Sequence, residues 1–112
     1  MAQSGQLKKL AGPAYIAASA TNVYTPEAAT IYTILKHLHF CNVTASAVTF
    51  SMYIGATGGS AAGTEIFKDL SIAAKSTYDW YGNVKMLSTD FLTAISTASS
   101  ITVVVMGELV VV

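Results

Sequence analysis

Large apolar and polar residues alternate with a period of two along most of the chain. The pattern is clearest from Val48 to Ile54, where every second residue is large and apolar and Thr49, Ser51 and Tyr53 lie between. Such alternation places the apolar side chains on one face of a β-strand. The segment is therefore predicted to be a strand with a buried apolar face.

The preceding segment, Ile31 to Cys41, also alternates. Asn42 to Ser46 has the composition of a turn, so this segment and Val48 to Ile54 are predicted to form an antiparallel hairpin. One face of the first strand carries Ile34, Lys36, Leu38 and Phe40, and the other carries Leu35, His37, His39 and Cys41.

Short strands separated by Gly, Asn, Ser and Thr continue to the end of the chain. They are predicted at Thr64–Lys68, Ser76–Tyr81, Val84–Leu87, Phe91–Ile95, Ile101–Met106 and Glu108–Val112, with Gly55 to Gly63 as a loop. Strands at this spacing are typical of a sandwich or a small barrel. We predict an all-β fold, a single antiparallel β-sandwich of the jelly-roll type with a flexible N-terminal arm.

The N-terminal region lacks this alternation. Gln3 to Ala11 is compatible with a helical turn, or residues 1–12 form a mobile arm. The predicted organisation is an arm and first-strand region over 1–24 and a β-sandwich over 25–112. The predicted core contains Leu38, Phe40, Val48, Phe50, Met52, Ile54, Ile101, Val103 and Val105.

The amino-acid composition argues against two classes of partner. The 112 residues are 53% hydrophobic and 11% charged, and six lysines balance six acidic residues. A nucleic-acid surface needs clustered positive charge, so no nucleic-acid partner is expected. The apolar run Ile101 to Val112 is shorter than the roughly 20 residues of a membrane helix, so no membrane partner is expected either. Gly12 and Pro13 interrupt the N-terminal apolar stretch, which favours a cytoplasmic product over a secreted one.

The polar face of the strand Ile31–Cys41 offers metal-ligating groups. His37, His39 and Cys41 follow one another at roughly 6.8 Å, so two of them could share a zinc ion with ligands from elsewhere. All three could not, because the outer pair is roughly 13 Å apart. The sequence places no acidic ligand beside them, and a strand face that packs on a neighbour is favoured. We expect no metal and no cofactor. Cys41 is the single cysteine, so no intrachain disulfide can form.

Catalytic patterns are not evident. A rigid strand holds His37, His39 and Cys41 too far apart for a nucleophile and its base, which need a separation of roughly 2.6–3.2 Å. The glycine-rich Gly55–Gly63 is followed by a predicted strand instead of a helix that could hold phosphate. No catalytic residues are predicted, and the protein is expected not to be an enzyme.

Two surfaces are candidates for binding. Tyr78, Trp80 and Tyr81 surround Asp79 and could form a carbohydrate platform, although alternation places Tyr81 opposite the other two. The C-terminal strand carries apolar residues on both faces and so needs a cover, for which a neighbouring subunit is predicted. The predicted interface comprises Leu109, Val110, Val111, Val112, Leu7 and Leu10.

In the order of its strand and turn segments, the chain resembles small virion proteins of tailed bacteriophages. The resemblance lies in His37–Asn42, the turn Thr44–Ala47, Val48–Gly55, Gly63–Phe67, Leu70–Ala74 and Ser76–Gly82, and it spans roughly Thr25 to Val112. The chain departs from the pattern at Pro26–Ala29, which lacks the glycine of a Pro-x-Gly turn, and at Thr89–Asp90, where Gly-Asp is common.

The resemblance implies a structural virion protein that is made in the host bacterial cytoplasm. It does not indicate the position in the particle, because decoration, neck, tail and fibre proteins all use small β domains. We predict a capsid decoration or cement protein that stabilises the head. Implied partners are the major capsid protein or other virion proteins and further copies of the chain, forming a trimer if the protein occupies three-fold positions. The alternative is a tail, neck or fibre component that binds a receptor or a carbohydrate.

Overall fold

The fold consists of β-strands, as predicted. A computed structural model describes residues 4–26, 30–56, 64–98 and 100–111. The strands in these ranges are β1 (Ser4–Tyr15), β2 (Thr21–Tyr24), β3 (Thr30–Asn42), β4 (Val48–Gly55), β5 (Glu65–Ile72), β6 (Thr77–Leu87), β7 (Phe91–Ser96) and β8 (Ile101–Val111). Among the described residues there is no helix with the length and apolarity to cross a bilayer.

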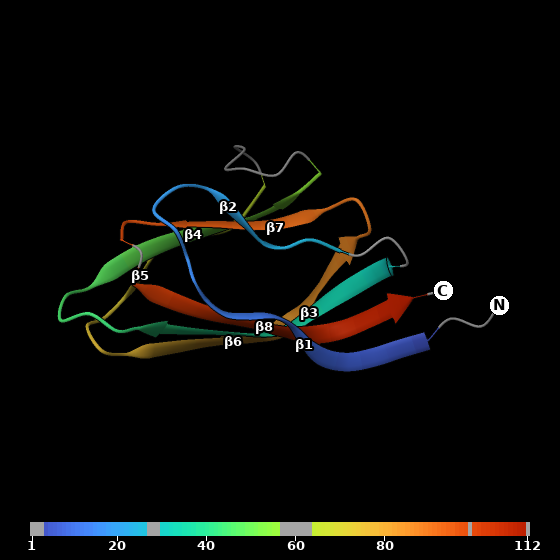
Figure 1. The fold of residues 1–112 in the computed structure, drawn as a ribbon, viewed down its shortest axis with the longest axis horizontal. Helices are drawn as coiled ribbons and strands as arrows, with labels where there is room; N and C mark the ends of the chain where they lie inside the picture. The colour runs from blue at the N-terminus through green and yellow to red at the C-terminus, as the bar shows by residue number, and fades with distance from the viewer. Residues whose placement is uncertain (1–3, 27–29, 57–63, 99, 112) are drawn as a thin grey trace.

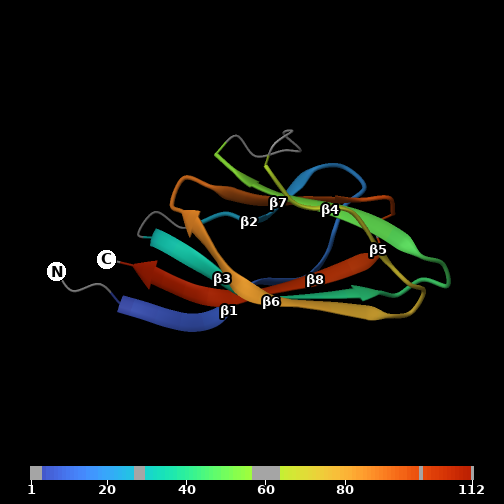
Figure 2. The ribbon, with the colours of Figure 1, turned by 180° about the vertical axis from the view of Figure 1, so that it is seen from behind.

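Two antiparallel four-stranded sheets face each other. Their strand orders are β1-β8-β3-β6 and β2-β7-β4-β5, and Figures 1 and 2 show them as two layers. The strands therefore pair as 1 with 8, 2 with 7, 3 with 6 and 4 with 5, alternately in one sheet and the other. A long hairpin rolled up in this way is a jelly roll. The predicted sandwich is thus confirmed.

The predicted hairpin between the segments that form β3 and β4 is wrong, because these strands lie in different sheets. Their apolar faces meet across the sandwich, where the rings of Phe40 and Phe50 lie 4.4 Å apart. A turn composition indicates that the chain changes direction. It does not indicate whether the next strand stays in the same sheet.

The predicted helical turn or mobile arm is also wrong over residues 4–12, which belong to β1. This strand pairs antiparallel with β8, with Lys9 opposite Met106 and Ala11 opposite Val105. Because β8 has a free ladder of backbone groups on its outer side, even a segment without apolar alternation can pair there. Gly12 lies where the register shifts, with φ +86°, and a Cβ there would lie 2.2 Å from the Val103 carbonyl oxygen.

At two places, two predicted strands form one continuous strand. Gly82 and Asn83 continue β6 instead of breaking it, and Gly107 continues β8. A Cβ on Gly107 would lie 2.1 Å from the carbonyl oxygen of Ile34, so this glycine permits close approach of two strands. Most of the predicted loop, residues 57–63, and Val112 lie outside the described residues.

The core lies between the sheets. Eight of the nine predicted core residues are buried, and Ile54 packs against them while partly exposed. Leu35 also joins the core, although strict alternation placed it with His37. The register of β3 shifts between these two residues, and such an irregularity reverses the face to which later side chains point.

Asn42 fixes the point where the chain leaves the first sheet. Its side chain is fully buried, and its amide nitrogen donates hydrogen bonds to the carbonyls of Ser46, Ile72 and Ala73 at 2.9, 3.0 and 3.2 Å. Its amide oxygen accepts from the backbone and hydroxyl of Thr44 at 3.1 and 2.8 Å. The Asn-x-Thr pattern at this position thus builds a turn.

Candidate functional site

Strand β3 presents two histidines on the outer face of its sheet. After the register shift, Leu38 and Phe40 point into the core, and His37 and His39 point away from it. Their side chains are 24% and 37% exposed. The alternation of a strand therefore turns the His-x-His sequence into a pair of neighbouring imidazoles on one surface.

Strand β6 adds a carboxylate to this pair. The register places Asp79 directly opposite His39 and Tyr81 opposite His37, so Asp79 is diagonal to His37. One oxygen of Asp79, Oδ1, lies 2.6 Å from Nδ1 of His39 and 2.8 Å from Nε2 of His37. We call these three residues the His–Asp cluster.

The protonation of the His–Asp cluster follows from its hydrogen bonds. An ionised carboxylate only accepts, so Nδ1 of His39 and Nε2 of His37 must both carry a proton. These bonds, the one from His39 first, lower the pKa of Asp79, and desolvation opposes them only in part. The carboxylate is therefore ionised at neutral pH.

The sequence identified the two histidines but not their acidic partner. The ligand atoms of His37, His39 and Asp79 lie within 4.8 Å of one another, and within the described ranges no other three His, Cys, Asp or Glu residues come together in this way. Cys41 lies further along β3 and is not part of the cluster. A cross-strand register is required to find Asp79, because 40 residues separate it from His39.

An apolar depression adjoins the cluster. The His37 ring stacks on that of Tyr81 with centroids 4.3 Å apart and planes 12° from parallel. Tyr81 is 71% exposed and Leu7, on β1, is 76% exposed. The depression has a volume of about 440 Å³, and it is lined by Leu7, Lys8, Lys9, Lys36, His37, Tyr81 and Met106.

The predicted carbohydrate platform is divided between two faces. Tyr78 and Trp80 point inward and pack edge-on against Phe67, with each ring centroid 6.3 Å from that of Phe67. Tyr81 points outward. The structure therefore does not bring the three rings together on one surface.

The residues predicted for an interface are also separated. They are Leu7, Leu10, Leu109, Val110, Val111 and Val112, of which Val112 lies outside the described residues. Leu109 and Val110 are buried within the chain itself, because β8 is a central strand between β1 and β3. Leu10 packs against the core, whereas Leu7 is exposed. A Val110→Asp substitution would therefore disturb folding, so it cannot serve as a test of association.

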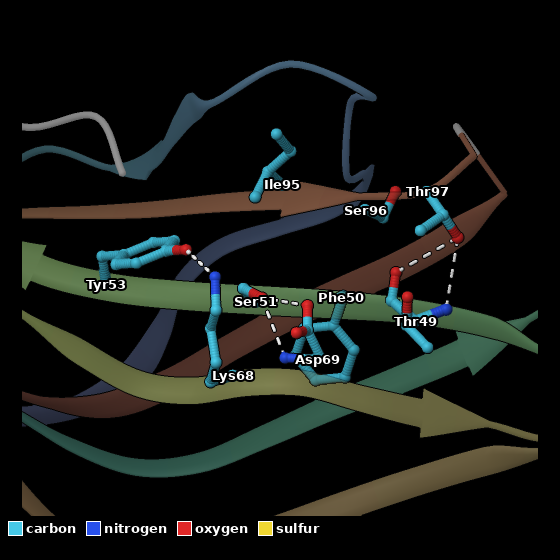
Figure 3. A pocket seen from close by; sticks show the side chains of 9 residues that line it. All are labelled: Thr49, Phe50, Ser51, Tyr53, Lys68, Asp69, Ile95, Ser96 and Thr97. Atoms are coloured by element: carbon cyan, nitrogen blue, oxygen red, sulfur yellow. Dashed lines mark hydrogen bonds between the residues drawn. The ribbon is translucent and has the colours of Figure 1, made fainter. Parts of the chain in front are cut away.

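The second sheet carries a different hollow, of about 280 Å³, between β4, β5 and β7 (Figure 3). Here the Ser51 hydroxyl accepts from the backbone nitrogen of Asp69 at 2.9 Å and donates to its carboxylate at 3.4 Å. The Lys68 ammonium donates to the Tyr53 hydroxyl at 3.5 Å, which raises the pKa of Lys68. The polar groups of this hollow are thus engaged with one another.

Comparison with known proteins relates the chain to others by fold. No protein family matches it, and no curated protein sequence does. A chain in the structure of infectious bursal disease virus strain Gx is 14% identical, with a TM-score of 0.57 over 99% of this chain and 33% of that one. The VP2 subviral particle of the same virus gives 13% identity and a TM-score of 0.55, over 97% and 32%.

A third structure matches over nearly its full length. A chain from the disulfide-linked pili of Bacillus endospore appendages is 16% identical, with a TM-score of 0.53 over 100% of this chain and 92% of that one. The chain thus spans about a third of the viral chains and nearly all of the pilus chain. At these identities the likeness shows the shared fold, and it agrees with the jelly-roll strand order.

Proposed function

We propose that the chain is a non-enzymatic structural protein of a bacteriophage virion that decorates the head and stabilises it by contact with the major capsid protein. The observation that carries the proposal is the jelly roll, formed by strands from Ser4 to Val111, an architecture used in viral shells. The fold likeness to virus particle chains supports a particle role, and the sequence resemblance to tailed-phage proteins supports the setting.

The surface around Leu7 supports assembly. Leu7 and Tyr81 are among the exposed large apolar side chains, and they line the same depression. Exposed apolar patches on small domains mark contact surfaces. We propose that this patch mediates contact with further copies of the chain, as a trimer at three-fold positions, or with another virion protein.

A second candidate is a tail, neck or fibre module that binds a receptor or a carbohydrate. The observation that favours it is the exposed ring of Tyr81, held flat against His37, since an aromatic face fixed in this way suits stacking on a sugar. It lacks the support of Tyr78 and Trp80, which pack inward.

Purified virions of the encoding phage test the two candidates. Quantitative mass spectrometry and cryo-electron microscopy should find many copies over the head lattice, and heads without the protein should rupture at a lower temperature. A few copies at the tail would instead support the binding module. Complete absence from purified particles would overturn both.

A further inference from the structure

We propose that His37, His39 and Asp79 bind a divalent transition-metal ion of the zinc class on the outer face of the β3–β6 pair. The argument begins with the donors. Two imidazoles and a carboxylate are a ligand set suited to zinc and related ions, whereas calcium and magnesium prefer oxygen ligands. The three ligand atoms lie within 4.8 Å of one another.

All three side chains must adjust to bind one ion. Two atoms bound to one zinc ion at about 2.0–2.2 Å lie roughly 3.3 Å apart in a tetrahedral site. The Asp79 oxygen is now 2.6 and 2.8 Å from the two nitrogens, as hydrogen bonds demand. The two imidazole nitrogens lie up to 4.8 Å apart, so both rings must also turn toward the ion by about 1.5 Å in total as the carboxylate retreats by roughly half an ångström. The carboxylate side chain is 35% exposed, so it has room to move.

The fold holds the remaining parts in place. Both histidines stand on a strand that is paired on each side, with β6 and with β8, so their backbones are fixed. The ring of His37 is further held by its stacking on Tyr81. Such preorganisation lowers the entropic cost of gathering the ligands.

Metal binding also requires each imidazole to change its tautomer. Nε2 of His37 and Nδ1 of His39 now donate to Asp79, and each must present a lone pair to the ion. A shift of each proton to the other nitrogen of its ring achieves this without a net loss. Three protein ligands leave a fourth position for water, as in open zinc sites.

Titration of tag-free protein with zinc chloride, followed by calorimetry, tests the site. We expect one zinc per chain and at least a tenfold weaker affinity in both His39→Ala and Asp79→Asn. Cobalt binding should give the visible absorption of a four-coordinate site in the wild type. Circular dichroism identifies any variant that fails to fold, and the isosteric Asp79→Asn then carries the test.

Cys41→Ser is the matched control, because Cys41 is the next metal-ligating side chain along β3 but lies outside the cluster. It should bind zinc like the wild type. The proposal is overturned if the wild type binds no zinc at millimolar concentration, if the cluster variants bind like the wild type, or if Cys41→Ser alone abolishes binding. None of these results bears on the virion role, which is tested on particles.

Discussion

Two polar clusters lie on the same strand and have opposite characters. Asn42, at the end of β3, is fully buried and makes all of its hydrogen bonds to the chain. Three residues earlier, His39 belongs to a cluster whose side chains are 24–37% exposed. The first joins loops that leave the two sheets, and the second joins two neighbouring strands.

The difference in burial indicates which polar groups stabilise the fold and which are free to bind a ligand. A buried polar group must be satisfied by the protein, because it has no water to replace a lost partner. An exposed group can exchange its protein partner for water or for a ligand at small cost. The Asn42 network is therefore expected to govern stability, and the His–Asp cluster is expected to govern binding.

Replacement of Asn42 should have the largest effect. Asn42→Ala leaves the buried carbonyl of Ile72 and its neighbours without their donor, and we expect a loss of about 3 kcal/mol in the free energy of unfolding. Urea denaturation measures it. A loss below about 1 kcal/mol would show that the Asn42 network does not govern the stability of the fold.

Disruption of the exposed apolar patch around Leu7 should have the second largest effect. Burial of a leucine is worth roughly 1.5–3 kcal/mol, so Leu7→Asp should weaken self-association at least about tenfold while leaving folding intact. Light scattering over a concentration series measures the change. Val43→Lys, at a side chain 51% exposed in the turn after β3, is the control and should associate like the wild type. A wild type that stays monomeric at high micromolar concentration contradicts the proposed contact between copies.

A smaller loss is expected at the edge of the buried network. The Thr44 hydroxyl donates to Asn42 at 2.8 Å, so Thr44→Val should cost about 1 kcal/mol. Thr44→Ser keeps the hydroxyl and should lie close to the wild type in the same urea titration. A loss in Thr44→Ser without a loss in Thr44→Val would indicate that the methyl group, and not the hydrogen bond, is responsible.

The exposed cluster should affect stability least, and its contribution should disappear in acid. Because its pKa is lowered in the folded protein, Asp79 favours folding above its unfolded pKa of about 3.9, and this contribution disappears as the pH falls through the folded value. Asp79→Asn should therefore melt like the wild type below that range and slightly lower at pH 7. Melting temperatures from about pH 7 to pH 2.5 test this. A large drop in the melting temperature of Asp79→Asn at pH 7 would indicate that the His–Asp cluster stabilises the fold.

Much of the fold could be predicted locally. The alternation over Val48–Ile54 correctly predicted the strand and the face that packs in the core, because a side chain's direction in a strand depends only on its position along the backbone. Ser51 and Tyr53, on the other face, are buried too. The same argument correctly set Tyr81 opposite Tyr78 and Trp80. It misplaced Leu35, since a one-residue irregularity reverses the faces and leaves no mark in composition.

The sequence by itself determined the β-sandwich, eight of its core residues and the strand face that two histidines share. Tertiary structure alone decided which strands pair: that β3 and β4 separate into two sheets, that β1 covers the side of β8, and that Asp79 lies opposite His39. Alternation is a property of neighbouring residues, whereas strand partners are selected by packing and backbone hydrogen bonding across the whole chain. For that reason the histidines were visible in the sequence, and the carboxylate that completes their cluster was not.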